Sequence, residues 1–147
     1  MRAGNFMDKA VWQMSDGERQ KTVMVVDDYE DLRHLTHLAL ETLGYRVVEA
    51  TNGEEAVELA QAELPDLILM DLSMPNLDGF AAIHRIRRLL GLRDVPVIAF
   101  SAHSSTDVRE DALAAGYCEF MTKPVNLDIL KATVERCLGA AEDLARS

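Results

Sequence analysis

Five short apolar runs, each followed by a stretch with helical periodicity, constrain the fold of this chain more than any other feature. The runs are Thr22–Val26, Tyr45–Ala50, Leu67–Met70, Val95–Phe100 and Tyr117–Met121. Strands that are apolar throughout are typical of a parallel sheet covered on both faces. Right-handed crossovers between such strands produce an open α/β sandwich. We therefore predict a doubly wound, five-stranded parallel sheet with five helices.

Capping residues mark where the predicted helices begin. Asn52, with Glu55 three residues later, resembles a capping box. We predict that Asp78 and Thr106 cap two of the later helices, and that the last helix comes after Asn126.

The first predicted helix ends at Gly44, a typical C-terminal cap. Helical spacing predicts one apolar side for this helix, consisting of Leu32, Leu35, Leu38, Ala39 and Leu43.

Length and composition exclude several classes of protein. The 147 residues suit one domain, and the 48% of apolar residues suffice for a core. A net charge of −10 argues against direct binding to nucleic acid, which requires a basic face. No apolar run approaches the roughly 20 residues of a membrane span, and the first 20 residues do not resemble a signal peptide. The two cysteines show no metal-ligand spacing, so we expect a reduced, cytoplasmic protein.

The residues directly after the predicted strands carry the chemistry. Asp27 and Asp28 come after the first strand, Asp71 after the third, Ser101 after the fourth and Lys123 after the fifth. In an open parallel sheet, ligands bind outside these carboxyl ends of the strands. Three converging carboxylates repel one another unless a cation offsets their charge. Oxygen ligands of this kind suit Mg²⁺ better than Zn²⁺.

Four segments, in this order, resemble the receiver domain of two-component response regulators. They read VVDDYEDLR, LPDLILMDLSMPNLDGF, VPVIAFSA and AAGYCEFMTKP. The resemblance covers residues 21–140, which implies a flavodoxin-like receiver domain there. It leaves residues 1–20 as an N-terminal extension, flexible or a short helix, and residues 141–147 as a C-terminal tail.

The resemblance implies a role for each strand-end residue. Asp71 is similar to the phosphoacceptor of the family. Asp27 and Asp28, together with Asp71 and the backbone carbonyl of Ser73, match the ligands of Mg²⁺, which Mn²⁺ can replace. Ser101 and Lys123 match the groups that stabilise the phosphoryl group.

Further positions of the family pattern concern the switch. Ser101 and Phe120 match the pair of residues that responds to phosphorylation. The resemblance implies a cis peptide between Lys123 and Pro124. Ser73 and His103 border the site and are expected to tune dephosphorylation.

These matches predict a cytoplasmic, single-domain response regulator of the chemotaxis type. We expect it to receive its phosphoryl group from a sensor histidine kinase or a histidine phosphotransfer protein. Because few residues come after the last helix, the output is expected through binding of another protein or through a relay. The protein is expected to be a monomer or weak dimer with no nucleic-acid or membrane contact, and not an enzyme apart from autodephosphorylation.

Two alternatives belong to other functional classes. A phosphatase with an aspartyl nucleophile would need a second acid two residues after Asp71, where the chain has Ser73. A flavodoxin-like cofactor-binding module would need hydroxyls and glycines in its first loop, whereas the sequence DDYED would repel a phosphate.

Overall fold

The computed structural model describes residues 19–74, 77–102 and 105–146, and in this part of the chain strands and helices alternate. The strands are β1 (Thr22–Val26), β2 (Arg46–Ala50), β3 (Leu67–Asp71), β4 (Val97–Ser101) and β5 (Glu119–Thr122). The helices are α2 (Glu30–Thr42), α3 (Gly53–Glu63), α4 (Gly79–Arg87), α5 (Thr106–Ala114) and α6 (Leu127–Arg146). Thus α6 continues through most of the predicted tail. The predicted N-terminal extension lies almost entirely outside the described residues.

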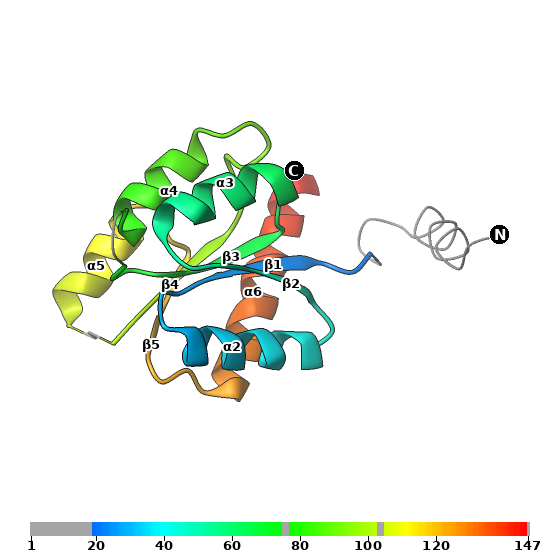
Figure 1. Cartoon of the computed structure of the whole chain (residues 1–147). Coiled ribbons are helices and arrows are strands. Elements are labelled where there is room, and N and C mark those ends of the chain that lie inside the picture. The colour runs from blue at the N-terminus through cyan, green and yellow to red at the C-terminus, as the bar shows by residue number, and fades with distance from the viewer. Residues whose placement is uncertain (1–18, 75–76, 103–104, 147) are drawn as a thin grey trace.

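All strand pairs are parallel, and the strand order is β2-β1-β3-β4-β5. Side chains alternate between the two faces of the sheet, as the period of two requires. On β1, Met24 and Val26 pack with α3, α4 and α5, while Val23 and Val25 pack with α2 and α6. Figure 1 shows the sheet between these two helical layers. The predicted doubly wound α/β fold is therefore confirmed.

The helix caps agree with the sequence except in two details. Asn52, Asp78 and Asn126 accept hydrogen bonds from the first-turn amides of α3, α4 and α6. The predicted cap Thr106 is wrong, because α5 already begins there and the Ser105 hydroxyl accepts from the amide of Val108. In the predicted capping box, Glu55 accepts from the amide of Thr51 and not from that of Asn52.

The predicted apolar side of α2 is partly wrong. Leu35 and Leu38 are 63% and 46% exposed, whereas Thr36 and Leu40 are buried. The Thr36 hydroxyl donates to the carbonyl of Leu32 (2.9 Å), which satisfies this buried polar group within the helix. The contact face of α2 is thus rotated away from the stripe that the leucines mark.

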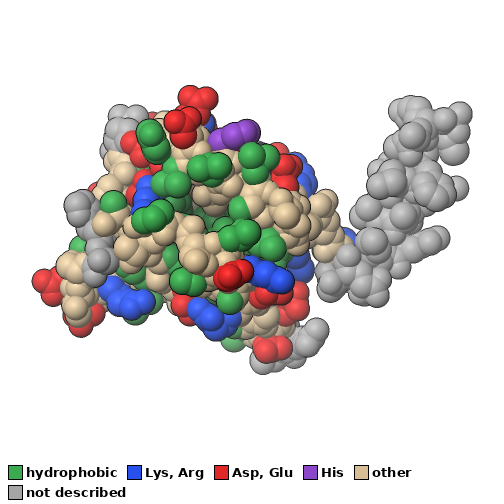
Figure 2. Space-filling view, turned by 90° about the horizontal axis from the view of Figure 1, so that it is seen from below, with side chains coloured by type: hydrophobic (Ala, Val, Ile, Leu, Met, Phe, Trp, Pro, Cys, Tyr) green, Lys and Arg blue, Asp and Glu red, His purple; other side chains and the backbone are tan. Residues whose placement is uncertain are grey.

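The surface on the side of α2 mixes hydrophobic and charged side chains (Figure 2). Exposed leucines and isoleucines occur on α2 and in the first turn of α6, among other places. Among the described helices, none combines the length and the apolar character that crossing a membrane requires.

A pair of glycine substitutions tests how closely α3 packs against the segment before α4. Gly53 begins α3, and a Cβ there would lie 1.9 Å from the carbonyl oxygen of Leu77. We predict that Gly53→Ala lowers the free energy of unfolding by about 1–3 kcal/mol, the usual cost of overpacking. A Cβ at Gly139, inside α6, would have no atom within 4 Å beyond its chain neighbours and the backbone of its own helix. Gly139→Ala should therefore raise the free energy of unfolding, by up to about 1 kcal/mol.

Urea denaturation of both variants checks this prediction. Equal effects of the two substitutions would contradict the close approach of α3 to the segment before α4.

Candidate functional site

The candidate site lies where the strand order reverses. The chain passes from β1 outward to β2 and then returns to β3 on the other side of β1. Asp27 and Asp28 come directly after β1, and Asp71 is the last residue of β3. Such a reversal leaves a crevice at the carboxyl ends of the strands, where ligands of open α/β sheets bind.

The three aspartates that the sequence singled out meet in the structure. Each offers one carboxylate oxygen, and these oxygens all lie within 4.8 Å of one another. Asp27 and Asp71 are buried, whereas Asp28 is exposed. Within residues 19–74, 77–102 and 105–146, no other group of three or more acidic, histidine or cysteine side chains has this geometry.

Lys123 brings a positive charge into ion-pair distance of two of these carboxylates. Its ammonium donates to Oδ2 of Asp71 (2.9 Å) and forms an ion pair with Oδ2 of Asp27 (3.2 Å). Its nitrogen also lies 5.0 Å from the centre of the Phe100 ring, a favourable cation–π distance. Burial alone would lower the pKa of Lys123, but the hydrogen bond to Asp71 and the charges of Asp71 and Asp27 raise it overall. The lysine is therefore held in its charged form.

One oxygen of Asp27 lacks a hydrogen bond. Oδ1 accepts a hydrogen bond from the amide of Tyr29 (2.9 Å). Oδ2 is buried and lies within ion-pair distance of the Lys123 ammonium, but it accepts no hydrogen bond. A buried carboxylate oxygen in this state is costly unless a cation offsets it. Three carboxylates and one ammonium leave excess negative charge. The residues therefore fit a hard divalent cation, and their oxygen ligands fit Mg²⁺.

The Asp71 carboxylate is held in place from two sides. Oδ1 accepts from the backbone amide of Ser73 (3.0 Å), and Oδ2 accepts from Lys123. Burial raises the pKa of Asp71, and the nearby charge of Asp27 raises it further, against the opposing effects of Lys123 and the Ser73 amide. The carboxylate is thus oriented, partly desolvated and next to a cation.

The predicted switch residues lie on the neighbouring strands β4 and β5. Ser101 ends β4 and is buried, and its carbonyl accepts from the amide of Lys123 (2.9 Å). Phe120 on β5 is 8% exposed and packs in the core layer of α3, α4 and α5, with the guanidinium of Arg109 5.7 Å from its ring centre. The Lys123–Pro124 peptide is cis.

Of the two residues predicted to tune dephosphorylation, one can be placed. Ser73 is exposed, two residues after Asp71. His103 lies outside the described residues.

Arg33 supports the site but was not identified from the sequence. Its guanidinium donates to the backbone carbonyl of Asp27 (3.0 Å) and to a carboxylate oxygen of Glu49 on β2 (2.6 Å). It therefore fixes the loop that carries Asp27 and Asp28. The position of Arg33 one turn into α2 does not predict that it supports the site, because its partner Glu49 on β2 is distant in sequence.

The fold and the strand-end carboxylates define a flavodoxin-like domain with an acidic, lysine-containing site. The model of the response regulator receiver domain matches residues 23–135. This chain therefore belongs to the receiver-domain family of two-component response regulators.

Individual relatives agree with this family. The chain is 38% identical over 125 residues to an uncharacterized 14.6 kDa protein of Leptolyngbya boryana, covering 84% of this chain and 95% of that protein. It is 34% identical to the probable transcriptional regulator ycf27 of Guillardia theta, covering 84% of this chain but only 47% of the regulator.

Solved structures show the same architecture. The chemotaxis protein CheY4 of Vibrio cholerae has a TM-score of 0.77 and 28% identity, with 81% of this chain and 99% of that chain covered. The receiver domain of a sensor histidine kinase of Pseudomonas aeruginosa has a TM-score of 0.76 and 33% identity, with 82% and 99% covered. That structure has a magnesium ion coordinated in its active-site cleft.

Magnesium should stabilise the folded protein through the aspartate cluster. We predict that Mg²⁺ at about 100 times its dissociation constant raises the free energy of unfolding by about 2.7 kcal/mol, as linkage requires. Asp28→Asn should abolish this gain without destabilising the metal-free protein, because it relieves repulsion between carboxylates. Thermal unfolding with and without Mg²⁺ measures both effects.

Asp111→Asn provides the matched control, since it removes an exposed aspartate of α5 that is not part of the cluster. It should keep the full gain from Mg²⁺. Equal responses of the two variants to Mg²⁺ would contradict the assignment of the metal to this site.

Proposed function

We propose that this protein is a response regulator that accepts a phosphoryl group on Asp71 with the help of Mg²⁺. The observation that carries the proposal is the position of Asp71 between a lysine ammonium and two further carboxylates. A receiver domain is a signalling module, so membership of the family implies phosphorylation-dependent signalling. The phosphorylated residue, the metal and the partners are what we add.

The reaction transfers the phosphoryl group from a phosphohistidine to the Asp71 carboxylate. A carboxylate oxygen attacks phosphorus, the P–N bond breaks, and the leaving imidazole takes up a proton. The product is an acyl phosphate. Repulsion between the carboxylate and the anionic phosphoryl oxygens is the main barrier, so neutralising charge is most of the catalytic task.

Lys123 performs part of this task. Its ammonium already contacts Oδ2 of Asp71 and is positioned to pair with a phosphoryl oxygen as charge moves there. The Ser101 hydroxyl would provide a second donor. We assign Asp27, Asp28, Asp71 and the backbone carbonyl of Ser73 as ligands of Mg²⁺, or of Mn²⁺ in its place. When bound, the metal would neutralise the negative charge of the phosphoryl oxygens, which otherwise repels the attacking carboxylate.

The phosphodonor proposed here is a sensor histidine kinase or a histidine phosphotransfer protein. Receiver domains are phosphorylated by histidine kinases, and similar sequences lie within sensor kinases such as CqsS of Vibrio cholerae, of which this chain spans 18%. The output would be binding of another protein, or transfer of the phosphoryl group onward in a relay. A cytoplasmic location and a monomeric or weakly dimeric state remain predictions.

A labelling experiment tests the phosphoacceptor. Incubation with acetyl phosphate and Mg²⁺ should add one phosphoryl group per chain, seen as a mass increase of the intact protein. Asp71→Asn or a chelator should abolish the increase, because one removes the nucleophile and the other the charge-neutralising metal. Asp111→Asn should be labelled like the parent. Labelling of Asp71→Asn at the parent's level would refute the assignment.

We further propose that phosphorylation changes the face made by α5, β5 and α6. Ser101 and Phe120 lie on neighbouring strands, and Phe120 is packed in a layer where a large side chain favours discrete positions. A Ser101 hydroxyl drawn toward the phosphoryl group would select between these positions. Ser73 and His103 would then set how fast water removes the phosphoryl group and resets the switch.

Chemical shifts with and without a beryllofluoride mimic test this coupling. We predict that Ser101→Ala still accepts the mimic but loses most of the shift changes over residues 106–120. The matched control is Thr122→Ala, because Thr122 pairs with Ser101 across β4 and β5 and its side chain is exposed. It should respond like the parent. A full response of Ser101→Ala would show that the hydroxyl does not couple the site to this face.

A further inference from the structure

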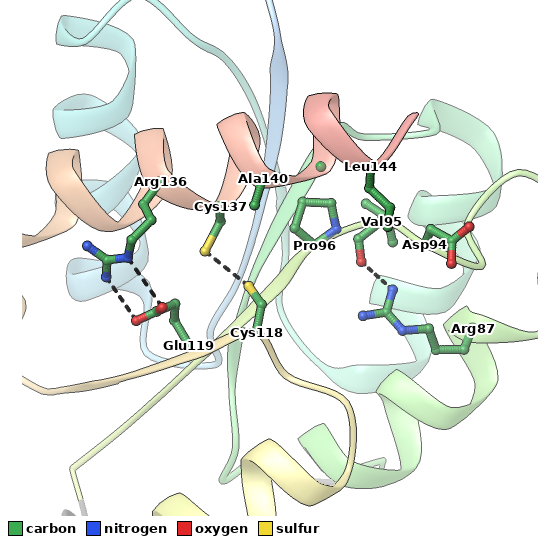
Figure 3. A pocket seen from close by; sticks show the side chains of 11 residues that line it. Arg87, Asp94, Val95, Pro96, Cys118, Glu119, Arg136, Cys137, Ala140 and Leu144 are labelled. Atoms are coloured by element: carbon green, nitrogen blue, oxygen red, sulfur yellow. Dashed lines mark hydrogen bonds and ion pairs between the residues drawn. The ribbon is translucent and has the colours of Figure 1, made fainter. Parts of the chain in front are cut away.

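The two cysteines of the chain lie next to each other, although 19 positions separate them in sequence. Cys118 directly precedes β5, and Cys137 lies in α6. Their sulfur atoms are 3.1 Å apart and share a hydrogen bond. Figure 3 shows the two side chains directed toward one another from the strand and the helix. We propose that Cys118 and Cys137 form a reversible disulfide when the folded protein meets a peroxide.

The backbone around both cysteines is fixed in a suitable position. The amide of Cys118 donates to the carbonyl of Val97 on β4 (2.9 Å), which anchors the residue to the sheet. The next residue, Glu119, accepts two hydrogen bonds from Arg136 (2.9 and 3.3 Å), the residue before Cys137. This two-point ion pair joins the same strand and helix as the cysteines. A disulfide has an S–S bond of about 2.05 Å, so closure requires a shift of about 1 Å.

An oxidant can reach the pair. Cys118 is exposed, whereas Cys137 is 5% exposed. Both line a surface pocket of about 260 Å³ together with Pro96, Arg136 and Leu144. The pocket is large enough for hydrogen peroxide, and its walls come from α6, from the segment before β4, from the start of β5 and from the end of α4. Cys118 is therefore the thiol that the oxidant meets first.

The electrostatic environment favours the same order of events. The hydrogen bond between the two sulfur atoms lowers the pKa of the Cys118 thiol, against the effects of burial and of the negative charge on Glu119. That hydrogen bond, together with burial, raises the pKa of Cys137. The thiolate is the form that reacts with peroxides, so Cys118 is the attacking sulfur and Cys137 the resolving one.

The reaction balances in two steps. The Cys118 thiolate attacks hydrogen peroxide, the O–O bond breaks, and sulfenic acid forms at Cys118 while hydroxide leaves and becomes water. The Cys137 thiol then attacks the sulfenic sulfur, and a second water leaves as the disulfide forms. Two thiols are oxidised and one peroxide is reduced. The disulfide closes a ring that contains Phe120 and Lys123 but leaves Asp71 outside it.

A metal site does not explain the pair. A structural zinc site has four ligands, which are typically cysteine and histidine side chains. In the part of the chain that the structure describes, the one cluster of three or more candidate ligands is the aspartate site. Two thiols in contact, without further ligands among the described residues, fit oxidation better than coordination.

Thiol counting tests the proposal. The full-length protein is reduced, freed of reductant, treated with hydrogen peroxide and then alkylated with a maleimide in denaturant. The number of alkylated thiols should fall from two per chain to none, the chain should stay monomeric on a non-reducing gel, and dithiothreitol should restore both thiols. Because seven methionines can also gain oxygen, the thiol count and not the total mass is the readout.

Single-cysteine variants identify the roles of the two sulfurs. With dimedone present, Cys137→Ser should trap a sulfenic acid on Cys118, while Cys118→Ser should give little adduct on Cys137. The Asp71→Asn variant should form the disulfide like the parent, which separates this chemistry from phosphorylation. Two thiols remaining after peroxide treatment, or cross-linked dimers in place of the internal disulfide, would overturn the proposal.

Discussion

The convergence of Asp27, Asp28 and Asp71 on the ammonium of Lys123 is the interaction on which the rest of the site depends. Parallel strands force it, because their carboxyl ends meet at one edge of the sheet. The arrangement costs folding stability, since three carboxylates repel and one buried oxygen of Asp27 lacks a hydrogen bond. The protein does not neutralise this surplus of negative charge by itself, and the surplus therefore fits the divalent cation that we propose for the site.

The surrounding fold holds this charged cluster in place from several directions. Arg33 anchors the loop after β1, the Ser73 amide orients Asp71, and the carbonyl of Ser101 holds the amide of Lys123. The last of these contacts ties the end of β4 to the residue that pairs with Asp71. Short backbone links therefore connect the Asp71 carboxylate to β5, which carries Phe120, and to the helices that pack against Phe120. The same few residues thus belong both to the candidate site and to the packing of the core.

The cysteine pair joins β5 to α6, two elements of the face that we propose to change on phosphorylation, but it lies away from the carboxylates. Cys118 and Cys137 connect β5 to α6, whereas the carboxylates lie at the other end of the strand, where Lys123 comes after β5. A covalent link there would restrain β5 and α6 without occupying the proposed phosphorylation site. The two reactions that we propose, phosphoryl transfer and thiol oxidation, would thus affect the same two elements, β5 and α6, through separate chemistry.

The sequence by itself determined the alternation of strands and helices, the helix caps at Asn52 and Asp78, and the residues at the strand ends. These features are local, because they depend on periodicity, on capping chemistry and on the residue types at the end of each apolar run. The tertiary structure alone decided that α2 buries Thr36 and Leu40 while Leu35 and Leu38 face solvent, because that depends on how the helix is seated against the sheet. It alone also brought Arg33 to Glu49 and Cys118 to Cys137. Such contacts arise from crossovers between distant segments, and no local pattern in the chain encodes them.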